Sequence, residues 1–521
     1  MESFERKGTW WVPGQESEAV GGILSFTDEE GLYLDLLGTL RDRPSMPAGI
    51  IPVLLGYADS MGMVTLAHCL PAGTRMSFPG PRYDAYRPSI ALAGAHIADP
   101  LGQTYQKARF TLSHLSEWVR AGGISIALAR QLGAATPITV EYTHPEVKRL
   151  DLSFGSLTIG STARTSGDLL SSFMISQDVY IDLEPLEAHP VEALLETYVL
   201  PVQAFLAFAT ERAAGITTLT LYSNDVLLDL GDGQTRRAPV QVYTSLRRAP
   251  EEPGKRLVPH DLLFTLSDVE RQLDQVIERW FGLYAEIPHC ANLLVGTYYS
   301  PHLHLDRVFL VLAQVSEIFH RSRFKRKKLP RMEFSKRMKL IAELNPSWLT
   351  VWIKDQVSNE LSFGQRLEEL VREYGECILP LWPDPQDFVR SAVVTRNYYT
   401  HYSSGLKKRA ARGRNLYLLC QALSTLVKSC LLAELGVSAK ERRLLFLRNQ
   451  AYLSVLRASA NVEARRLFTS SEIQERNTRI LATYRSGRMT QKEIAALVGL
   501  APSSVSRIVR ESRSADASAP R

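Results

Sequence analysis

The spacing of apolar residues divides the chain into a β-rich first part and a helical second part. Up to about residue 185, short apolar runs rich in β-branched residues partly alternate with polar positions and are broken by Gly, Pro and Asp. This alternation is typical of strands in a sandwich or a barrel. Examples are GIIPVLLGYA, ITVEYTH, RLDLSFGSLTIG and DVYIDLEP. We therefore predict a β-rich N-terminal domain.

The β pattern is interrupted once and then returns. Residues 189–215 have helical periodicity, and Pro201 predicts a kink or break in that helix. Two further strands are predicted at 216–223 and 238–246, joined through a hairpin-type turn at Asp232-Gly233. From about residue 259 the pattern is helical, so we place the β-rich domain at 1–258 and a helical connector at 259–300.

Residues 301–460 show helical periodicity with short connections, which predicts an α-helical bundle. One helix has a clear start, because Asp384 can cap it, Pro385 suits the first helical position and Asp387 adds negative charge to the first turn. We expect it to run to Tyr402. The six predicted helices are 305–324, 334–356, 363–378, 385–402, 415–436 and 439–457.

Residues 470–513 have the pattern of a trihelical helix-turn-helix unit. Ile494 and Ala495 would pack the second helix, Gly499 would make the turn, and Val505 and Ile508 would anchor the third. The pattern resembles the DNA-binding units of regulators and site-specific recombinases, whose recognition helix enters the major groove. Protein contact or RNA binding are alternative uses. The expected DNA-contacting residues are Ser503, Ser504, Ser506, Arg507 and Arg510, and residues 514–521 are expected to form a disordered tail.

Charge separates the two parts further. The formal net charge of the 521 residues is +6, but residues 1–300 hold 35 Asp and Glu against 23 Lys and Arg, whereas residues 301–521 hold 20 against 38. A block this basic suggests a polyanionic partner such as nucleic acid. The alternatives are that the basic part is simply soluble or docks onto the acidic part.

The remaining composition excludes several classes. We find no stretch of about 18 apolar residues and no apolar signal core at the N-terminus, so we expect a cytoplasmic protein without membrane contact. The five cysteines are scattered and contain no CxxC pair, which argues against disulfides and zinc fingers and indicates reduced, mostly buried thiols. We expect no metal site and no cofactor.

Arg396, Asn397 and His401 form the strongest candidate for chemistry. In the predicted helix, Asn397 and His401 lie four residues apart on one face, and the long Arg396 side chain can swing toward it. Imidazole transfers protons near neutral pH, guanidinium holds phosphate bidentately, and an amide orients either group. RNA supplies its own nucleophile in the 2′-hydroxyl, so metal-free cleavage is chemically feasible. The alternative is an ordinary surface helix with a charged tail.

The segment RNYYTH at 396–401, late in a bundle whose first helix reads LDRVFLVLAQVSEIFHR, resembles the HEPN domain, in particular that of ApeA-like proteins. The N-terminal stretch GTWWVPGQESEAVGGILSFTDEEGLYLDLLG resembles the start of the β-rich domain that precedes it. This resemblance implies a metal-independent endoribonuclease of antiphage abortive infection, active as a homodimer or higher oligomer with a composite site. It assigns proton transfer to His401, phosphate stabilisation to Arg396 and positioning to Asn397. The predicted fold class is therefore α+β multidomain: a β-rich domain, a HEPN helical bundle at 301–460 and a small helix-turn-helix.

Two basic segments are candidates for RNA binding. RSRFKRKK at 321–328 holds six cations in eight residues, and we single out Arg326, Lys327 and Lys328; Lys407, Lys408 and Arg409 follow the motif. Each segment can equally be an ordinary solvated loop. On the first bundle helix, Glu317 and His320 are candidates for supporting the site, or are satisfied inside the bundle.

Two rival functions remain open at this point. One is a transcriptional regulator whose helical domain only dimerises, and the other is a structural RNA-binding protein. A free nuclease would harm its host, so we expect the N-terminal domain to restrain it and to respond to a phage-derived trigger.

Overall fold

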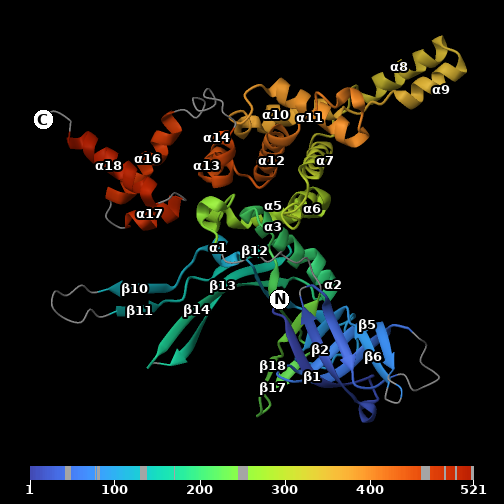
Figure 1. The fold of residues 1–521 in the computed structure, drawn as a ribbon, viewed down its shortest axis with the longest axis vertical. Helices are drawn as coiled ribbons and strands as arrows, with labels where there is room; N and C mark the ends of the chain where they lie inside the picture. Colours follow the sequence, from blue (N-terminus) through green and yellow to red (C-terminus); the bar gives the residue numbers. More distant parts are fainter. Residues whose placement is uncertain are drawn as a thin grey trace. The chain divides into compact units, whose positions relative to one another are not determined.

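A computed structural model describes residues 1–27, 29–40, 49–76, 78, 82–128, 138–168, 170–244, 256–458, 470–485, 489–498 and 502–517 (Figure 1). The chain divides into two compact units. The first comprises Met1–Leu257 with Thr265–Glu278, and the second comprises Val258–Phe264 with Arg279–Arg521. The predicted α+β organisation is confirmed, with a β-rich region followed by a helical region.

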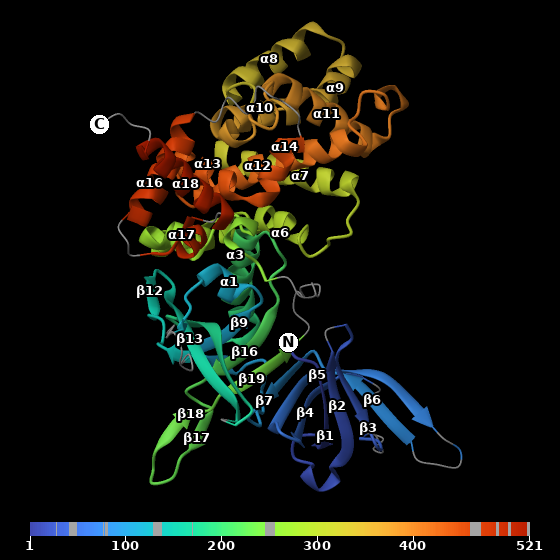
Figure 2. The same ribbon diagram turned by 60° about the vertical axis from the view of Figure 1, so that its left-hand side comes forward.

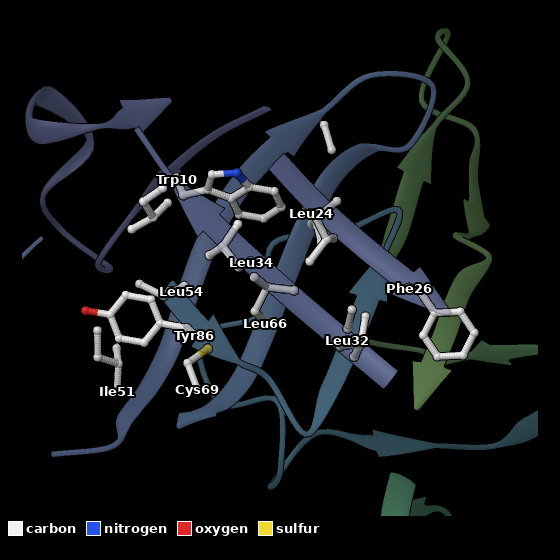
Figure 3. Close-up of a cluster of buried hydrophobic side chains, with 14 of the residues drawn as sticks. Trp10, Leu24, Phe26, Leu32, Leu34, Ile51, Leu54, Leu66, Cys69 and Tyr86 are labelled. Atoms are coloured by element: carbon white, nitrogen blue, oxygen red, sulfur yellow. The ribbon is translucent and has the colours of Figure 1, made fainter. Parts of the chain in front are cut away.

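Six antiparallel strands form a closed barrel in the first unit. Neighbouring strands follow the order β5-β4-β1-β2-β3-β6, and pairing of β5 with β6 closes the ring. Alternate residues point inward, and their side chains form the apolar core, in which Trp10, Leu34, Leu66 and Tyr86 are fully buried (Figure 3). The strands are β1 (Phe4–Trp11), β2 (Val20–Thr27), β3 (Gly31–Leu36), β4 (Ile51–Ala58), β5 (Gly62–Met76) and β6 (Arg82–Arg87).

The barrel continues into an open antiparallel sheet through the long strand β5. One stretch of β5, Val64–Ala67, pairs with β7, and the order runs on through β19, β16, β9, β14, β13 and β12 (Figure 2). These strands are β7 (Ile90–Ala93), β9 (Lys107–Leu112), β12 (Lys148–Leu152), β13 (Gly155–Asp168), β14 (Ser172–Pro185), β16 (Ile216–Tyr222) and β19 (Val240–Thr244). Barrel and open sheet therefore share one hydrogen-bonded sheet of 13 strands.

Three short two-stranded pairs complete the β structure of the first unit's described residues. They are β8 (Thr104–Tyr105) with β15 (His189–Pro190), β10 (Ile124–Leu128) with β11 (Ile138–Tyr142), and β17 (Leu227–Asp229) with β18 (Thr235–Arg237). The predicted turn at Asp232-Gly233 closes the last pair, with φ of 53° and 75°. The two strands predicted around it pair directly with each other as β16 and β19.

The helix predicted at 189–215 is a buried core helix with an irregular turn. It consists of α2 (Val191–Leu194), a π-helical turn at Leu195–Val199 and α3 (Leu200–Thr210). Pro201 follows that turn at the start of α3, where its missing N–H does least harm. The predicted irregularity is present, but as a π-helical turn that ends before Pro201 rather than as a break at Pro201 itself.

Two helical stretches are long and apolar enough to cross a membrane, contrary to our reading of the sequence. They are Val191–Thr210 and Gly413–Glu434. Both are mostly buried inside the protein, as core helices of a soluble protein are. The cytoplasmic location stays a prediction.

Helices dominate the described residues of the second unit, where α7 and α12 pack on each other. The helices are α6 (Pro288–Gly296), α7 (Leu305–Phe324), α8 (Arg331–Leu344), α9 (Ser347–Gln356), α10 (Phe363–Tyr374), α11 (Pro385–His401), α12 (Gly413–Glu434), α13 (Ala439–Arg448) and α14 (Gln450–Ala458), and α5 (Leu273–Glu286) begins in the first unit and ends in the second. Short helices α1 (Leu115–Val119) and α4 (Leu266–Val269) belong to the first unit.

Two of the six helices predicted for the bundle are each two helices. The segment 334–356 breaks between α8 and α9 at Asn345-Pro346, because the residue before a proline is driven out of the helical conformation. The segment 439–457 breaks at Asn449, whose side chain accepts a hydrogen bond from the Tyr452 backbone N–H at 2.9 Å and so caps α14. These two predictions were wrong.

Three C-terminal helices pack around a small core of their own. They are α16 (Ser470–Arg485), α17 (Gln491–Val498) and α18 (Pro502–Ala517). Ile494, Ala495, Val505 and Ile508 are buried together there. The turn predicted at Gly499 lies outside the described residues, as do 518–521 of the expected tail, whereas α18 extends over 514–517. Assignment of this unit as a helix-turn-helix stays a prediction.

All five cysteines are free and buried, as the sequence indicated. Burial raises the pKa of the Cys69, Cys290, Cys377 and Cys420 thiols to about 12, and that of Cys430 also rises. Thiolates are therefore scarce at neutral pH, and these side chains act as small apolar core residues.

Candidate active site

Both ends of helix α11 are set by interactions and backbone conformations of neighbouring residues. The Asp384 carboxylate accepts hydrogen bonds from the backbone N–H groups of Gln386 at 2.9 Å and Asp387 at 3.1 Å. Pro385 occupies the first helical position. The helix ends at His401, one residue before the predicted end, because Tyr402 adopts the left-handed conformation with φ of 49°. The candidate residues therefore occupy the last two turns of α11.

The three candidate residues are only partly brought together within one chain. The Arg396 guanidinium donates from Nη1 to Asn397 Oδ1 at 3.4 Å, and its Cζ lies 5.9 Å from the centre of the Phe363 ring on α10. His401 is exposed and makes no hydrogen bond with another described residue. Arg396 is thus held toward α10, while the imidazole stays open to a ligand or to another chain.

The segment after α11 is folded back onto the helix by an aromatic cluster. Tyr398 lies 5.0 Å from Tyr399 and 5.7 Å from Tyr402, ring centre to ring centre. Arg412 donates to the Tyr398 hydroxyl at 2.8 Å, and the Ala411 N–H donates to Thr395 Oγ1 at 3.0 Å. The chain is therefore fixed on both sides of the basic run at 407–409.

The two predicted basic segments differ in what their cations contact. Lys407, Lys408 and Arg409 are exposed, and none of them forms an ion pair with a described residue. Their charges are free to attract phosphate.

In the other basic segment, the three cations singled out already form ion pairs or hydrogen bonds. Arg326 lies 3.2 Å from a Glu369 carboxylate oxygen, and Lys327 pairs with Glu360. Lys328 donates to the Ser358 carbonyl at 3.2 Å. The sequence could not show this, because these acceptors lie more than 25 residues further along the chain.

A buried polar network joins α7 to α10 behind that segment. Arg366, which is 2% exposed, donates to His320 Nδ1 at 3.1 Å and to Glu360 at 2.8 Å. His320 Nε2 donates in turn to Glu369 at 2.7 Å. Because Nδ1 accepts from a guanidinium, the imidazole is neutral with its proton on Nε2. Burial lowers the pKa of His320, together with the positive charges of Arg366 and Arg326, which favours the same neutral state.

The network decides between the two readings of the first-helix candidates. His320 is fully buried and satisfied inside the bundle, and Glu317 pairs with Arg321 at 2.9 Å on the surface of α7. Among the described residues, neither forms a hydrogen bond, ion pair or ring contact with the three candidate residues. Of the two, only His320 is linked to the motif, through Arg366, which lies one turn after Phe363, the ring beneath Arg396.

The residues expected to meet DNA lie on the accessible side of α18 with one exception. Ser503, Arg507 and Arg510 are exposed and Ser504 is half-buried. Ser506 donates to the Gln491 side chain at 2.6 Å and so links α18 to α17. A positioning role within the three-helix unit explains Ser506 better than a base contact.

Sequence reasoning missed the residues that hold the site together. Phe363, Tyr398 and Arg412 contact or flank the motif, yet aromatic and basic residues on amphipathic helices give no signal of such a role. Only the adjacent pair of tyrosines inside the motif could have suggested an aromatic cluster. Among the described residues, no three His, Cys, Asp or Glu side chains are grouped so that they could hold a metal ion.

A helical domain with an Arg-Asn-His set at the end of a late helix, of which the His is exposed, preceded by a β-barrel domain, defines an ApeA-type HEPN architecture. The chain belongs to the ApeA-like HEPN family: the family model of ApeA N-terminal domain 1 matches residues 5–280, and that of Apea-like HEPN matches residues 310–441. No curated protein and no solved structure matches the chain.

Proposed function

We propose that the protein is a metal-independent endoribonuclease, acting in antiphage defence, whose site is completed by a second copy of the chain. The observation that carries the proposal is the placing of Arg396, Asn397 and His401 on the last two turns of α11 in an ApeA-like HEPN domain. The established family supports the nuclease class; the roles of individual residues rest on the chemistry below.

Cleavage of RNA by its own 2′-hydroxyl requires two proton transfers. The 2′-oxygen loses a proton as it attacks phosphorus, and the departing 5′-oxygen gains one. The products end in a 2′,3′-cyclic phosphate and a 5′-hydroxyl. The motif of one chain supplies one imidazole, that of His401, whereas a two-fold dimer brings two motif imidazoles together, one to take and one to give the proton. Two proton transfers and one motif imidazole per chain together support a composite site.

Arg396 is assigned to the phosphate. Its guanidinium uses one N–H on Asn397, and the Phe363 ring supports it from the side, so further N–H groups remain for two phosphate oxygens. Negative charge grows on these oxygens in the transition state, where a fixed cation stabilises most. Tyr402, which is 66% exposed beside His401, offers a ring on which a base can stack.

The β-rich domain and the C-terminal unit are assigned regulatory roles. A nuclease without restraint destroys its host's RNA, so we assign restraint, and release by a phage-derived trigger, to the N-terminal domain. DNA binding through α18 would localise the protein or regulate its own synthesis. A regulator without nuclease activity is the rival function.

One assay separates these functions. The purified protein is incubated with tRNA or mRNA in EDTA, with and without lysate of phage-infected cells. We expect fragments with 2′,3′-cyclic phosphate ends, because no step of the mechanism needs a metal. Binding without cutting would instead identify a structural RNA-binding protein. Binding of DNA alone would identify a regulator, and a strict need for magnesium would contradict the mechanism.

The two basic segments make unequal contributions to RNA binding on this proposal. Changing Lys407, Lys408 and Arg409 together to glutamine should weaken binding and reduce the slope of log K against log salt by about 2, since each phosphate contact on a single strand contributes roughly 0.7. Changing Arg326, Lys327 and Lys328 should reduce it less, because glutamates already pair with two of them.

Filter binding over a range of salt concentrations measures both slopes, in a His401→Ala background that leaves the RNA intact. The second triple variant is the matched control, since it removes the same number of charges. Equal slopes for the two variants would contradict this assignment.

A further inference from the structure

Strands β9, β14 and β16 of the open sheet have one buried face and one polar face. Phe110, Ile181 and Leu219 are neighbours across the three strands and are all buried. One position along, Arg109 of β9 lies directly opposite Asp182 of β14. Because successive side chains of a strand point to opposite faces, these charged residues belong to the other face of the sheet.

A buried carboxylate fixes two cations on the polar face. The Arg109 guanidinium donates from Nε and Nη2 to the two Asp182 oxygens, at 2.6 and 2.7 Å. Lys107 Nζ lies 2.8 Å from Asp182 and 3.0 Å from Glu184. Burial alone would lower the pKa of Lys107, but its hydrogen bonds and attraction to the two carboxylates outweigh burial and raise it. Both cations are therefore charged and held in place before any ligand arrives.

A cavity of about 510 Å³ adjoins these two cations. Such a volume lies within the range of roughly 300–1,000 Å³ that is usual for small-molecule sites. Besides the two fixed cations, Tyr222 of β16 and two arginines of the β17–β18 hairpin, Arg236 and Arg237, line it (Figure 2). All of these residues belong to the first unit, so the cavity lies within one compact body.

The charges around the cavity favour an anionic ligand. Arg236 and Arg237 are exposed, and neither forms an ion pair with a described residue. Among the described residues that line the cavity, Glu184 is the single carboxylate, and it already pairs with Lys107. With Asp182 included, four cations face two carboxylates, which leaves two positive charges in excess. A phosphate monoester carries a charge of about −1.5 to −2 at neutral pH and so matches this excess.

The rest of the lining favours a ligand that also has a flat ring. Lys107 Nζ lies 6.0 Å from the centre of the Tyr222 ring, so cation and aromatic ring adjoin in the same cavity. Pro239 and the aliphatic stems of the arginines add further apolar surface. An acidic peptide would use the cations alone, whereas a nucleotide has both a phosphate for the arginines and a base for the ring.

We infer that this cavity binds a nucleotide, with its phosphate on Arg236 and Arg237 and its base against Tyr222. The cations already held by Asp182 lower the entropic cost of binding, because they need no further ordering. The inference concerns the β-rich unit and does not rest on the proposed nuclease activity.

The test is calorimetric titration of the full chain with each of the four ribonucleoside monophosphates, their nucleosides and inorganic phosphate. We expect one nucleotide at least to bind, and its nucleoside to bind at least about tenfold more weakly, as loss of one hydrogen bond to a charged group predicts. Arg236→Gln/Arg237→Gln should weaken nucleotide binding by at least the same factor. Its far-UV circular dichroism should not change, because both side chains are exposed. Tyr222→Leu should weaken binding of the nucleotide but not of inorganic phosphate.

The matched control is Arg75→Gln/Arg164→Gln, which removes the same two charges from the same unit outside the cavity. Those side chains are 75% and 74% exposed, and the variant should bind the nucleotide like the wild type.

The outcomes separate this inference from the proposed function. Nucleotide binding that is lost in Arg236→Gln/Arg237→Gln and kept in the control supports the inference, even in a protein that cuts no RNA. Absence of nucleotide binding overturns it, as do equal losses in the two double variants. Inorganic phosphate that binds as tightly as every nucleotide would show a plain anion site and overturn it. Binding of a short 5′-phosphorylated RNA alone would assign the cavity to a strand end and overturn it too.

Discussion

His401→Ala is expected to lower RNA cleavage about 10²–10⁴-fold, the usual contribution of one positioned proton-transfer group. The imidazole is exposed and makes no hydrogen bond within the described chain, so its removal should leave the fold unchanged. Cleavage of a labelled RNA under single-turnover conditions measures the loss. Arg396→Ala should cause a loss of similar size through the phosphate.

The control is His302→Ala, an exposed histidine in the same unit, which should cleave at the wild-type rate. Mixing gives a stricter test of the composite site. In an equal mixture of wild-type and His401→Ala chains that exchange freely, about a quarter of the dimers hold two wild-type imidazoles. The cleavage rate should therefore fall to about a quarter of the rate of the same total amount of wild-type protein. An His401→Ala protein that cuts RNA at the wild-type rate would refute the assignment.

Arg366→Ala is expected to destabilise the helical bundle by about 3 kcal/mol, the lower end of the cost of breaking a buried charge network. The substitution leaves Glu360 without its buried partner and His320 Nδ1 without a donor. The same change should also lower cleavage, because the α10 turn that carries Phe363 beneath Arg396 loses its anchor. Hydrogen exchange of α7 and α10 and chemical denaturation measure the effect.

Arg390→Ala is the matched control, since that arginine lies on α11 with its side chain 62% exposed and, among the described residues, forms an ion pair only with Asp387, at 3.5 Å. Exposed substitutions of this kind usually change stability by less than about 0.5 kcal/mol. Equal denaturation midpoints for the two variants would show that the buried network does not hold the bundle.

Local signals in the sequence predicted the helix that carries the candidate site almost completely. Asp384 and Pro385 fix its start through a cap and a preset φ, both of which depend only on neighbouring residues. The Asn345-Pro346 pair carried an equally local signal of a break, but an uninterrupted apolar period across it favoured one long helix. The division of this segment into α8 and α9 was missed for that reason.

Contacts between distant residues could not be predicted. Arg366 occupies a charged position on an amphipathic helix, where exposure is the ordinary expectation, and only the fold brings it to His320, 46 residues away. Alternation likewise indicated strands but could not distinguish a sandwich from a barrel. That distinction depends on the pairing of β5 with β6, whose register only the folded sheet sets.

The long strand β5 has a consequence for how the N-terminal region can change in evolution or in the laboratory. Because this one strand belongs both to the closed ring and to the open sheet, no cut within it leaves two pieces with paired edges. Neither piece could be exchanged, deleted or expressed alone without exposing unpaired backbone.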